Sequence, residues 1–102
     1  MSFFPEELYV LLRERAGDPD AGNSHTKHLL EKGSSTIVRK LIEKSAQTAE
    51  AAMDQDLEMI AETVGDLWYL SLVTMLYYGI TPDQVESYLL SCHKKSDPRK
   101  RG

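Results

Sequence analysis

The sequence predicts an all-α fold in which about five helices are arranged around two long antiparallel helices. Apolar residues recur every three or four positions along most of the chain, which is the period of an amphipathic helix. Short stretches rich in Gly, Pro, Asp and Asn interrupt this pattern, and no segment has the pattern of a strand. The length of 102 residues suits a single domain.

The first two helices are expected to be short. Pro5 suits the first turn of a helix whose apolar positions are Phe4, Leu8, Leu11 and Leu12. Turn-forming residues at 16–23 then end this helix. Ser24 is expected to cap a second helix that runs to Lys32, and Gly33 to supply the left-handed residue that ends it.

Two long helices are expected in the middle of the chain. The first begins at Ser34 or Ser35, and its predicted buried side consists of Ile37, Leu41, Ala49, Ala52 and Met53. Residues 54–56 form the turn. Asp56 is expected to cap the second long helix, where its carboxylate interacts favourably with the positive end of the helix dipole. This helix is expected to run to about Tyr78.

The second long helix is apolar almost all round from Val64 onward, and its residues include Leu67, Trp68, Tyr69, Leu70, Leu72, Val73, Met75 and Leu76. Trp68 and Tyr69 are interpreted as core residues rather than as stacking platforms. A helix that is apolar on every side must be covered on every side. One chain of this length has too few other helices for that, so we expect an obligate helical dimer of identical chains, or a dimer of dimers.

The last helix is predicted from a clear start signal. Gly79 ends the preceding helix, and residues 81–84 (TPDQ) match a capping box with proline in the first position. The residues expected to face inward are Val85, Leu89 and Cys92. Cys92 is interpreted as a small buried apolar residue.

Charge divides the chain into two parts. Residues 94–102 carry five basic side chains and one acidic one, which leaves seven basic and 15 acidic residues in the rest. We expect residues 1–93 to form the single domain and residues 94–102 to be a basic, disordered tail. Because the body is acidic, general nucleic-acid binding is not expected.

The sequence also suggests a location. Its single cysteine excludes an intrachain disulfide and a cysteine metal cluster. The N-terminus does not have the pattern of a signal peptide, and the most apolar run, residues 67–78, is shorter than the roughly 20 residues that span a bilayer. We therefore expect a cytoplasmic protein without a membrane partner. Three histidines without ligand partners at useful spacing are interpreted as surface residues: His25, His28 and His93.

Acidic residues gather on the two long helices, and only Lys44 opposes them. They are Glu43, Glu50, Asp54, Asp56, Glu58, Glu62 and Asp66. Carboxylates on a face shared by two antiparallel helices can hold a hard cation such as Mg²⁺. A solvated acidic face is the alternative.

The chain resembles the phosphoribosyl-ATP pyrophosphatase family of histidine biosynthesis. Residues 24–33 read SHTKHLLEKG, which is similar to the family signature Ser-Tyr-Thr-…-Leu-…-Lys-Gly. The resemblance continues without a gap to Leu89. Residues 40–43 (KLIE) are similar to the family's Lys-Val-Gly-Glu. The family's Glu-Glu-Ala-Ala-Asp-Leu-Leu-Tyr falls at the positions of Glu62, Asp66, Leu67 and Tyr69.

This resemblance implies an all-α pyrophosphatase fold, dimers or higher assemblies, and cleavage between the α and β phosphates with release of pyrophosphate. It also implies two metal-binding pairs, Glu-x-x-Glu and Glu-x-x-Asp, one on each long helix. The corresponding residues in this chain are Lys44, Gln47, Thr63 and Asp66. Three of the four carboxylates are replaced, so the metal loses most of its electrostatic attraction.

Two alternatives follow for these positions. A relocated Mg²⁺ site would use Glu43, Glu50, Glu62 and Asp66, with Glu43, Glu62 and Asp66 in catalysis. Alternatively, the Lys44 ammonium takes the place of the metal and pairs with Asp66. The residues expected to bind substrate phosphates are Ser24, Thr26, Lys32, Arg39 and Lys40, although Lys32 and Lys40 also suit plain solvated helix surfaces.

The leading hypothesis is therefore a divergent, catalytically impaired member of the family, without a cofactor, that binds a phosphoribosyl nucleotide or acts as a regulatory paralogue. The alternative is an active phosphoribosyl-ATP pyrophosphohydrolase with a relocated Mg²⁺ site. A purely structural interaction domain is the third hypothesis.

Overall fold

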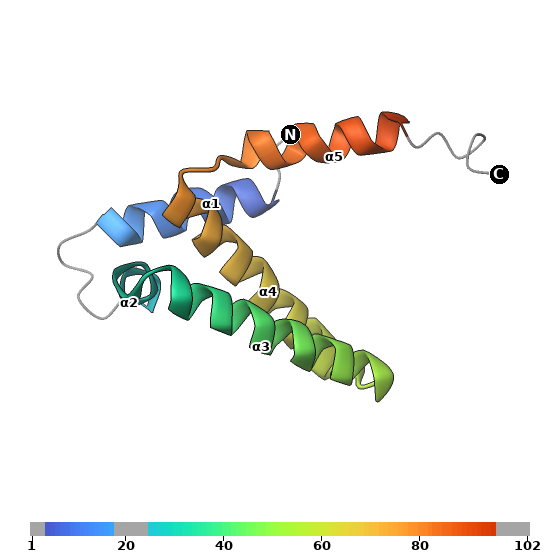
Figure 1. Cartoon of the computed structure of the whole chain (residues 1–102). Coiled ribbons are helices and arrows are strands. Elements are labelled where there is room, and N and C mark those ends of the chain that lie inside the picture. The colour runs from blue at the N-terminus through green and yellow to red at the C-terminus, as the bar shows by residue number, and fades with distance from the viewer. Residues whose placement is uncertain (1–3, 18–24, 96–102) are drawn as a thin grey trace.

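A computed structural model describes residues 4–17 and 25–95 of the chain, and these residues form five helices (Figure 1). The helices are α1 (Phe4–Gly17), α2 (His25–Lys32), α3 (Ser34–Met53), α4 (Leu57–Tyr78) and α5 (Pro82–Lys95). The expected all-α fold with two long central helices is confirmed. The predicted tail from residue 94 begins within the last turn of α5, and residues 96–102 lie outside the described part.

The long helices α3 and α4 form an antiparallel hairpin that is the longest part of the molecule (Figure 1). The helix α2 contacts both of them, whereas α1 contacts α2, α4 and α5. The core lies on both sides of α4. One cluster consists of Leu29, Ile37, Leu70 and Val73, and a second consists of Tyr9, Leu12 and Leu72, with Tyr69 packed against both.

Both ends of α4 and the start of α5 form as the sequence predicts, whereas the predicted cap Ser24 lies outside the described residues. The Asp56 side chain accepts a hydrogen bond from the Met59 amide at 3.1 Å at the start of α4. Gly79 ends α4 with φ of 70°, in the left-handed region that favours glycine. At the start of α5 the Thr81 amide donates to Gln84 Oε1 at 2.8 Å, which confirms the predicted capping box.

The predicted buried side of α3 is partly wrong. Ile37 is buried and Leu41 is half-buried, but Ala49 and Ala52 are exposed and Met53 is 84% exposed. The residue that α4 buries in this part of α3 is Ala51. The buried or half-buried positions 37, 41, 44, 48 and 51 follow the helical period, whereas Ala49, Ala52 and Met53 are apolar residues on another face.

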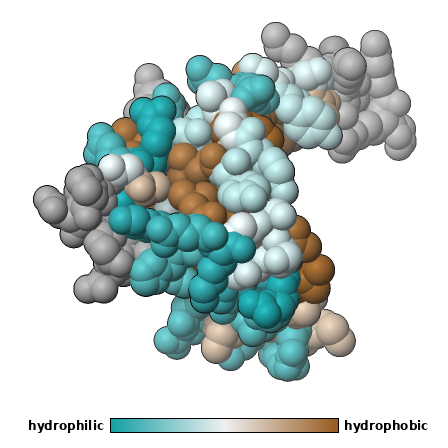
Figure 2. Space-filling model, turned by 60° about the vertical axis from the view of Figure 1, so that its left-hand side comes forward, coloured by the Kyte–Doolittle hydropathy of each residue, from teal (hydrophilic) through white to brown (hydrophobic). Residues whose placement is uncertain are grey.

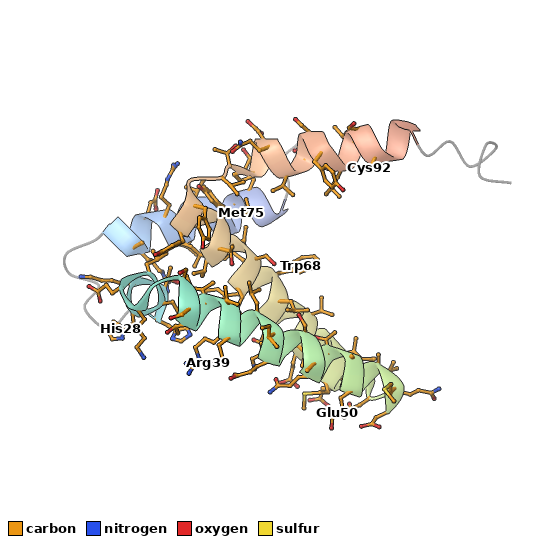
Figure 3. The ribbon with its side chains drawn as sticks, in the orientation of Figure 1. His28, Arg39, Glu50, Trp68, Met75 and Cys92 are labelled. Atoms are coloured by element: carbon orange, nitrogen blue, oxygen red, sulfur yellow. The ribbon has the colours of Figure 1, made fainter. Side chains whose placement is uncertain are left out.

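Three predicted core residues of α4 and α5 are more exposed than expected. Trp68 is 50% exposed, Leu89 is 43% exposed, and Cys92 is half-buried. They are exposed because α5 contacts α1 alone among the described helices and leaves one face of α4 uncovered. In Figure 3 Trp68 projects from α4 into the space beside α5. A pocket of about 330 Å³ opens there, lined by Trp68, Ser71, Leu72, Met75, Pro82, Val85 and Leu89.

The helix α4 is long and apolar enough to cross a membrane by length and composition, although a core helix of a soluble protein meets the same criteria. It is the one such helix in the described residues. Only 22% of its most apolar stretch is buried. Hydrophobic side chains are visible at the surface in Figure 2, in a hollow between hydrophilic regions. Apolar surface of this kind is typical of a face that another molecule covers.

We predict that Gly79→Ala and Gly65→Ala change stability in opposite directions. Alanine at position 79 must adopt a positive φ, which costs about 1–2 kcal/mol. Gly65 lies within α4, and a Cβ there meets no atom within 4 Å, so alanine should add about 1 kcal/mol of helix propensity. Urea denaturation at one protein concentration measures both changes, and a stabilising Gly79→Ala would contradict the helix end described here.

Candidate functional site

The four positions to which the sequence assigned a metal face each other across the α3–α4 hairpin. We call Lys44, Gln47, Thr63 and Asp66 the interhelix junction. Lys44 Nζ lies 3.2 Å from Asp66 Oδ2 and donates a hydrogen bond to Gln47 Oε1 at 3.1 Å. Gln47 comes three residues after Lys44, and Thr63 comes three residues before Asp66. Because the two helices are antiparallel, Gln47 and Thr63 therefore lie at the same level along the hairpin. The predicted Lys44–Asp66 ion pair is confirmed.

Thr63 contributes no carboxylate to this junction, and its hydroxyl is hydrogen-bonded to its own helix. Its side chain is buried, and its hydroxyl donates to the Met59 and Ile60 carbonyls of its own helix, at 2.9 and 3.2 Å. The junction therefore holds one carboxylate, one ammonium and two neutral groups. A divalent cation does not fit this set, because the ammonium of Lys44 occupies the one carboxylate and repels a second cation.

The carboxylates of the relocated site do not converge within one chain. Glu43, Glu50 and Glu62 are exposed, and Glu43 lies 3.9 Å from Arg39 in a loose ion pair within α3. In the stretches covered by the structure, no three His, Cys, Asp or Glu side chains are close enough together to hold a metal ion. Within the described residues, a single chain therefore offers a metal ion neither the carboxylates of the family's two pairs nor those of the relocated set.

A second acidic region lies at the end of the hairpin, where Figure 3 labels Glu50. Glu50, Asp54 and Asp56 line an open pocket of about 440 Å³ together with Gln47, Ala51 and Met59. Sequence reasoning named Asp54 and Asp56 as members of the acidic run and as turn residues, and Asp56 also as a helix cap, but it placed neither in a pocket. The pocket is next to Gln47, and therefore borders the interhelix junction.

The helix α2 is tied to α4 by a buried polar contact. Thr26 Oγ1 and the Tyr69 hydroxyl share a hydrogen bond of 2.7 Å, and the His25 ring stacks on Tyr69 with centroids 5.9 Å apart. Burial raises the pKa of the Tyr69 phenol above its ordinary value of 10.0, and the bond to Thr26 opposes this more weakly. Thr26 thus uses its hydroxyl to fix α2, and its role in phosphate binding stays a prediction.

The other predicted phosphate-binding residues lie apart from Thr26. Lys32 is exposed at the end of α2, Arg39 is exposed on the outer side of α3 (Figure 3), and Lys40 is half-buried. Ser24 lies outside the described residues. Lys40 stands one helical turn before Lys44, so its side chain is on the same face of α3 as the interhelix junction. His25 and His28 are exposed, as expected, and the side chain of His93 is not among those described.

Sequence reasoning missed the contact that Tyr69 makes. It interpreted Tyr69 as a core residue, and the ring is indeed half-buried against both clusters. Its hydroxyl nevertheless reaches Thr26 across a separation of 43 residues. No local pattern signals a pair this far apart; a tyrosine on a buried face, whose hydroxyl needs a partner, was the only hint.

Comparison with known proteins gives a consistent result. Residues 6–91 match the family model described as phosphoribosyl-ATP pyrophosphohydrolase. A phosphoribosyl-ATP pyrophosphatase of Lacticaseibacillus casei is 39% identical over 84 residues, which are 82% of this chain and 76% of that protein. One from Methylibium petroleiphilum is 36% identical over 76 residues, which cover 74% of this chain but only 62% of the relative.

A third relative is a longer protein. The histidine biosynthesis bifunctional protein HisIE of Prochlorococcus marinus is 36% identical over 91 residues, or 89% of this chain and 41% of that protein. The matched region therefore spans less than two thirds of this relative and of the Methylibium protein. In all three cases the similarity includes most of the described helices.

We predict that Tyr69→Phe lowers the free energy of unfolding at pH 7 by about 1–2 kcal/mol, because it leaves the buried Thr26 hydroxyl without its partner. The raised pKa of Tyr69 also has a consequence at high pH. Above about pH 10 the unfolded chain releases the phenol proton while the folded chain retains it, so stability falls as pH rises.

Urea denaturation between pH 7 and pH 11 measures both effects. Above pH 10 the free energy of unfolding of Tyr69→Phe should fall less steeply with pH than that of the natural protein. Tyr77→Phe, at a residue of the same helix that is 40% exposed, is the matched control and should keep the natural profile. An unchanged stability of Tyr69→Phe at pH 7 would show that the contact with Thr26 contributes nothing.

Proposed function

Because the chain belongs to the phosphoribosyl-ATP pyrophosphohydrolase family, we propose that it hydrolyses phosphoribosyl-ATP to phosphoribosyl-AMP and pyrophosphate in histidine biosynthesis. The match over residues 6–91 is the observation that carries this proposal, since it includes all of α2, α3 and α4 and hence the interhelix junction. The names of the relatives agree better with an active enzyme than with the expected loss of catalysis.

The chain's own residues suggest how the substrate is held. Lys32, Arg39 and Lys40 supply positive charge along α2 and the first half of α3, and the triphosphate of the substrate carries the opposite charge. Asp66 at the junction and Glu62, one turn before it on α4, are the carboxylates proposed to orient the attacking water and accept its proton. Glu43 lies on the facing helix beside Lys44.

Magnesium enters this proposal only through the triphosphate. A divalent cation bound there would neutralise phosphate charge. The interhelix junction does not fit such an ion, because Lys44 is paired with Asp66 at 3.2 Å. No step of the reaction is therefore assigned to a metal held by Lys44, Gln47, Thr63 and Asp66.

The same ion pair favours a second candidate function. A junction with one carboxylate and one ammonium can retain a nucleotide without cleaving it, and the chain would then bind a phosphoribosyl nucleotide as a regulatory paralogue. The two candidates share a ligand class and differ in turnover. In both we propose a cytoplasmic protein.

We further propose that the working unit contains two copies of the chain, joined through α4 and α5. Several apolar side chains of these helices are exposed, and two of them, Trp68 and Leu89, line the open pocket beside α5. The others include Tyr78, Tyr88 and Leu90. An α4 helix that is apolar on nearly every side requires a cover, and a second α4–α5 pair supplies one of matching character. A dimer of dimers would extend the same arrangement.

We predict that the protein releases pyrophosphate from phosphoribosyl-ATP in the presence of Mg²⁺, and that Glu62→Ala/Asp66→Ala lowers the rate by about 100-fold or more, the usual contribution of a general base. The measurement is a coupled pyrophosphate assay at high enzyme concentration. Glu14→Ala/Glu86→Ala, which removes two carboxylates from α1 and α5, is the control and should keep the rate, because neither helix contacts α3.

Absence of release by the natural protein would reject the first candidate function. Binding of phosphoribosyl-ATP in a calorimetric titration would then support the second. Equal rates in the natural protein and in Glu62→Ala/Asp66→Ala would show that these carboxylates do not take part.

We predict that the protein has two or four times the mass of its 11.5 kDa chain in light scattering. Trp68→Glu/Leu89→Glu should shift it toward a single chain, because burying two carboxylates in an apolar interface is costly. Met53→Glu, at an exposed apolar residue at the far end of α3, is the control and should keep the natural mass. A natural protein that stays at 11.5 kDa at high concentration would contradict the dimer.

A further inference from the structure

The ammonium of Lys44 lies where α3 and α4 come together, and it is held from both helices. It contacts Asp66 of α4 at 3.2 Å and Gln47 of α3 at 3.1 Å. A cation is thus fixed to the chain itself between the two helices. Lys44 is one of the four positions at which the family resemblance implies a divalent ion, and such an ion does not fit the side chains present here.

The ammonium retains capacity to bind. A lysine has three N–H donors, and the contacts with Asp66 and Gln47 use two of them. The Lys44 side chain is 34% exposed, so it is open in part to solvent and to a ligand. An anionic oxygen is the natural partner for such a donor.

The neighbouring charges suit the same ligand. Lys40 lies one turn before Lys44 on the same face of α3, and within the described ranges it forms no ion pair. The charges of Lys44 and Asp66 cancel, so Lys40 supplies the unpaired positive charge on this face of α3. In addition, the carboxylate of Glu43 is directed to Arg39, at 3.9 Å, rather than to Lys44.

From this arrangement we infer that Lys44 acts as a built-in cation, and that the junction binds the phosphate oxygens of its ligand directly, together with Lys40 and without a divalent metal. This inference rests on the proposed phosphoribosyl-nucleotide ligand class. Because the ammonium is covalently part of α3, phosphate binding at the junction requires neither capture nor release of a metal ion.

Calorimetric titration with inorganic pyrophosphate tests the inference. The natural protein should bind pyrophosphate in excess EDTA, and replacing EDTA with Mg²⁺ should make binding no stronger, since chelation lowers the negative charge that Lys44 and Lys40 attract. Lys44→Gln should weaken binding in EDTA by about tenfold or more, the loss expected for a charge-assisted hydrogen bond. Lys44→Arg, which keeps the charge, should retain most of the affinity.

Two further variants complete the design. Arg15→Gln removes one positive charge from α1, a helix that does not contact α3, and should bind as the natural protein does. Lys44→Glu/Gln47→Glu replaces the ammonium by carboxylates and should bind pyrophosphate only when Mg²⁺ is present. Melting curves by circular dichroism establish that each variant is folded before its affinity is compared.

Three results would overturn the inference: tenfold stronger binding by the natural protein with Mg²⁺, equal affinity of Lys44→Gln and the natural protein, or no pyrophosphate binding in EDTA. Its failure is distinguishable from failure of the proposed activity. Turnover of phosphoribosyl-ATP without binding in EDTA overturns this inference alone. Binding in EDTA without turnover supports it and rejects the first candidate function.

Discussion

The register of α3 against α4 determines which side chains of this protein can meet. Apolar contacts fix it at one end, where Ile37 packs in the same cluster as Leu70 and Val73. Further along, the same register brings Lys44 to Asp66. Since side chains repeat every 3.6 residues, a slip by one residue would turn Lys44 away from α4 and would also remove Ile37 from the core. Packing and polar recognition therefore depend on one alignment.

The remaining helices are attached to this hairpin by contacts of different kinds. The short α2 combines the apolar contact of Leu29 with the buried hydrogen bond between Thr26 and Tyr69. This bond is specific, because an unpartnered hydroxyl at either position would be costly. It holds α2 in one orientation beside the start of α3, and so fixes where Lys32 and Lys40 stand relative to each other.

Local signals in the sequence were sufficient for the ends of the helices. Asp56, Gly79 and the Thr81–Gln84 pair act within three or four residues, so their effect follows from neighbouring residues alone. The buried face of α3 was harder to predict, because Ala49, Ala52 and Ala51 are alike in composition and only the position of α4 decides which is covered. Trp68 shows a related limit: apolar character predicts that a residue is covered, but not whether its own chain or a second copy covers it. At the candidate site, the opposition of Lys44 and Asp66 was predictable from the family resemblance, whereas the link between Thr26 and Tyr69 spans 43 residues and has no local pattern.

The position of α5 has a consequence for the lifetime of a single chain. Within the described residues α5 contacts α1 alone, and α1 itself holds to the body through α2 and α4. The free energy that keeps α5 in place is therefore small compared with that of the whole domain, and its amides should exchange with solvent through local opening rather than through global unfolding. In the proposed dimer a second copy covers this helix, so a newly made chain that is still alone would expose it to proteases first. Under that proposal the cellular abundance of the protein would depend on how quickly two chains associate after synthesis.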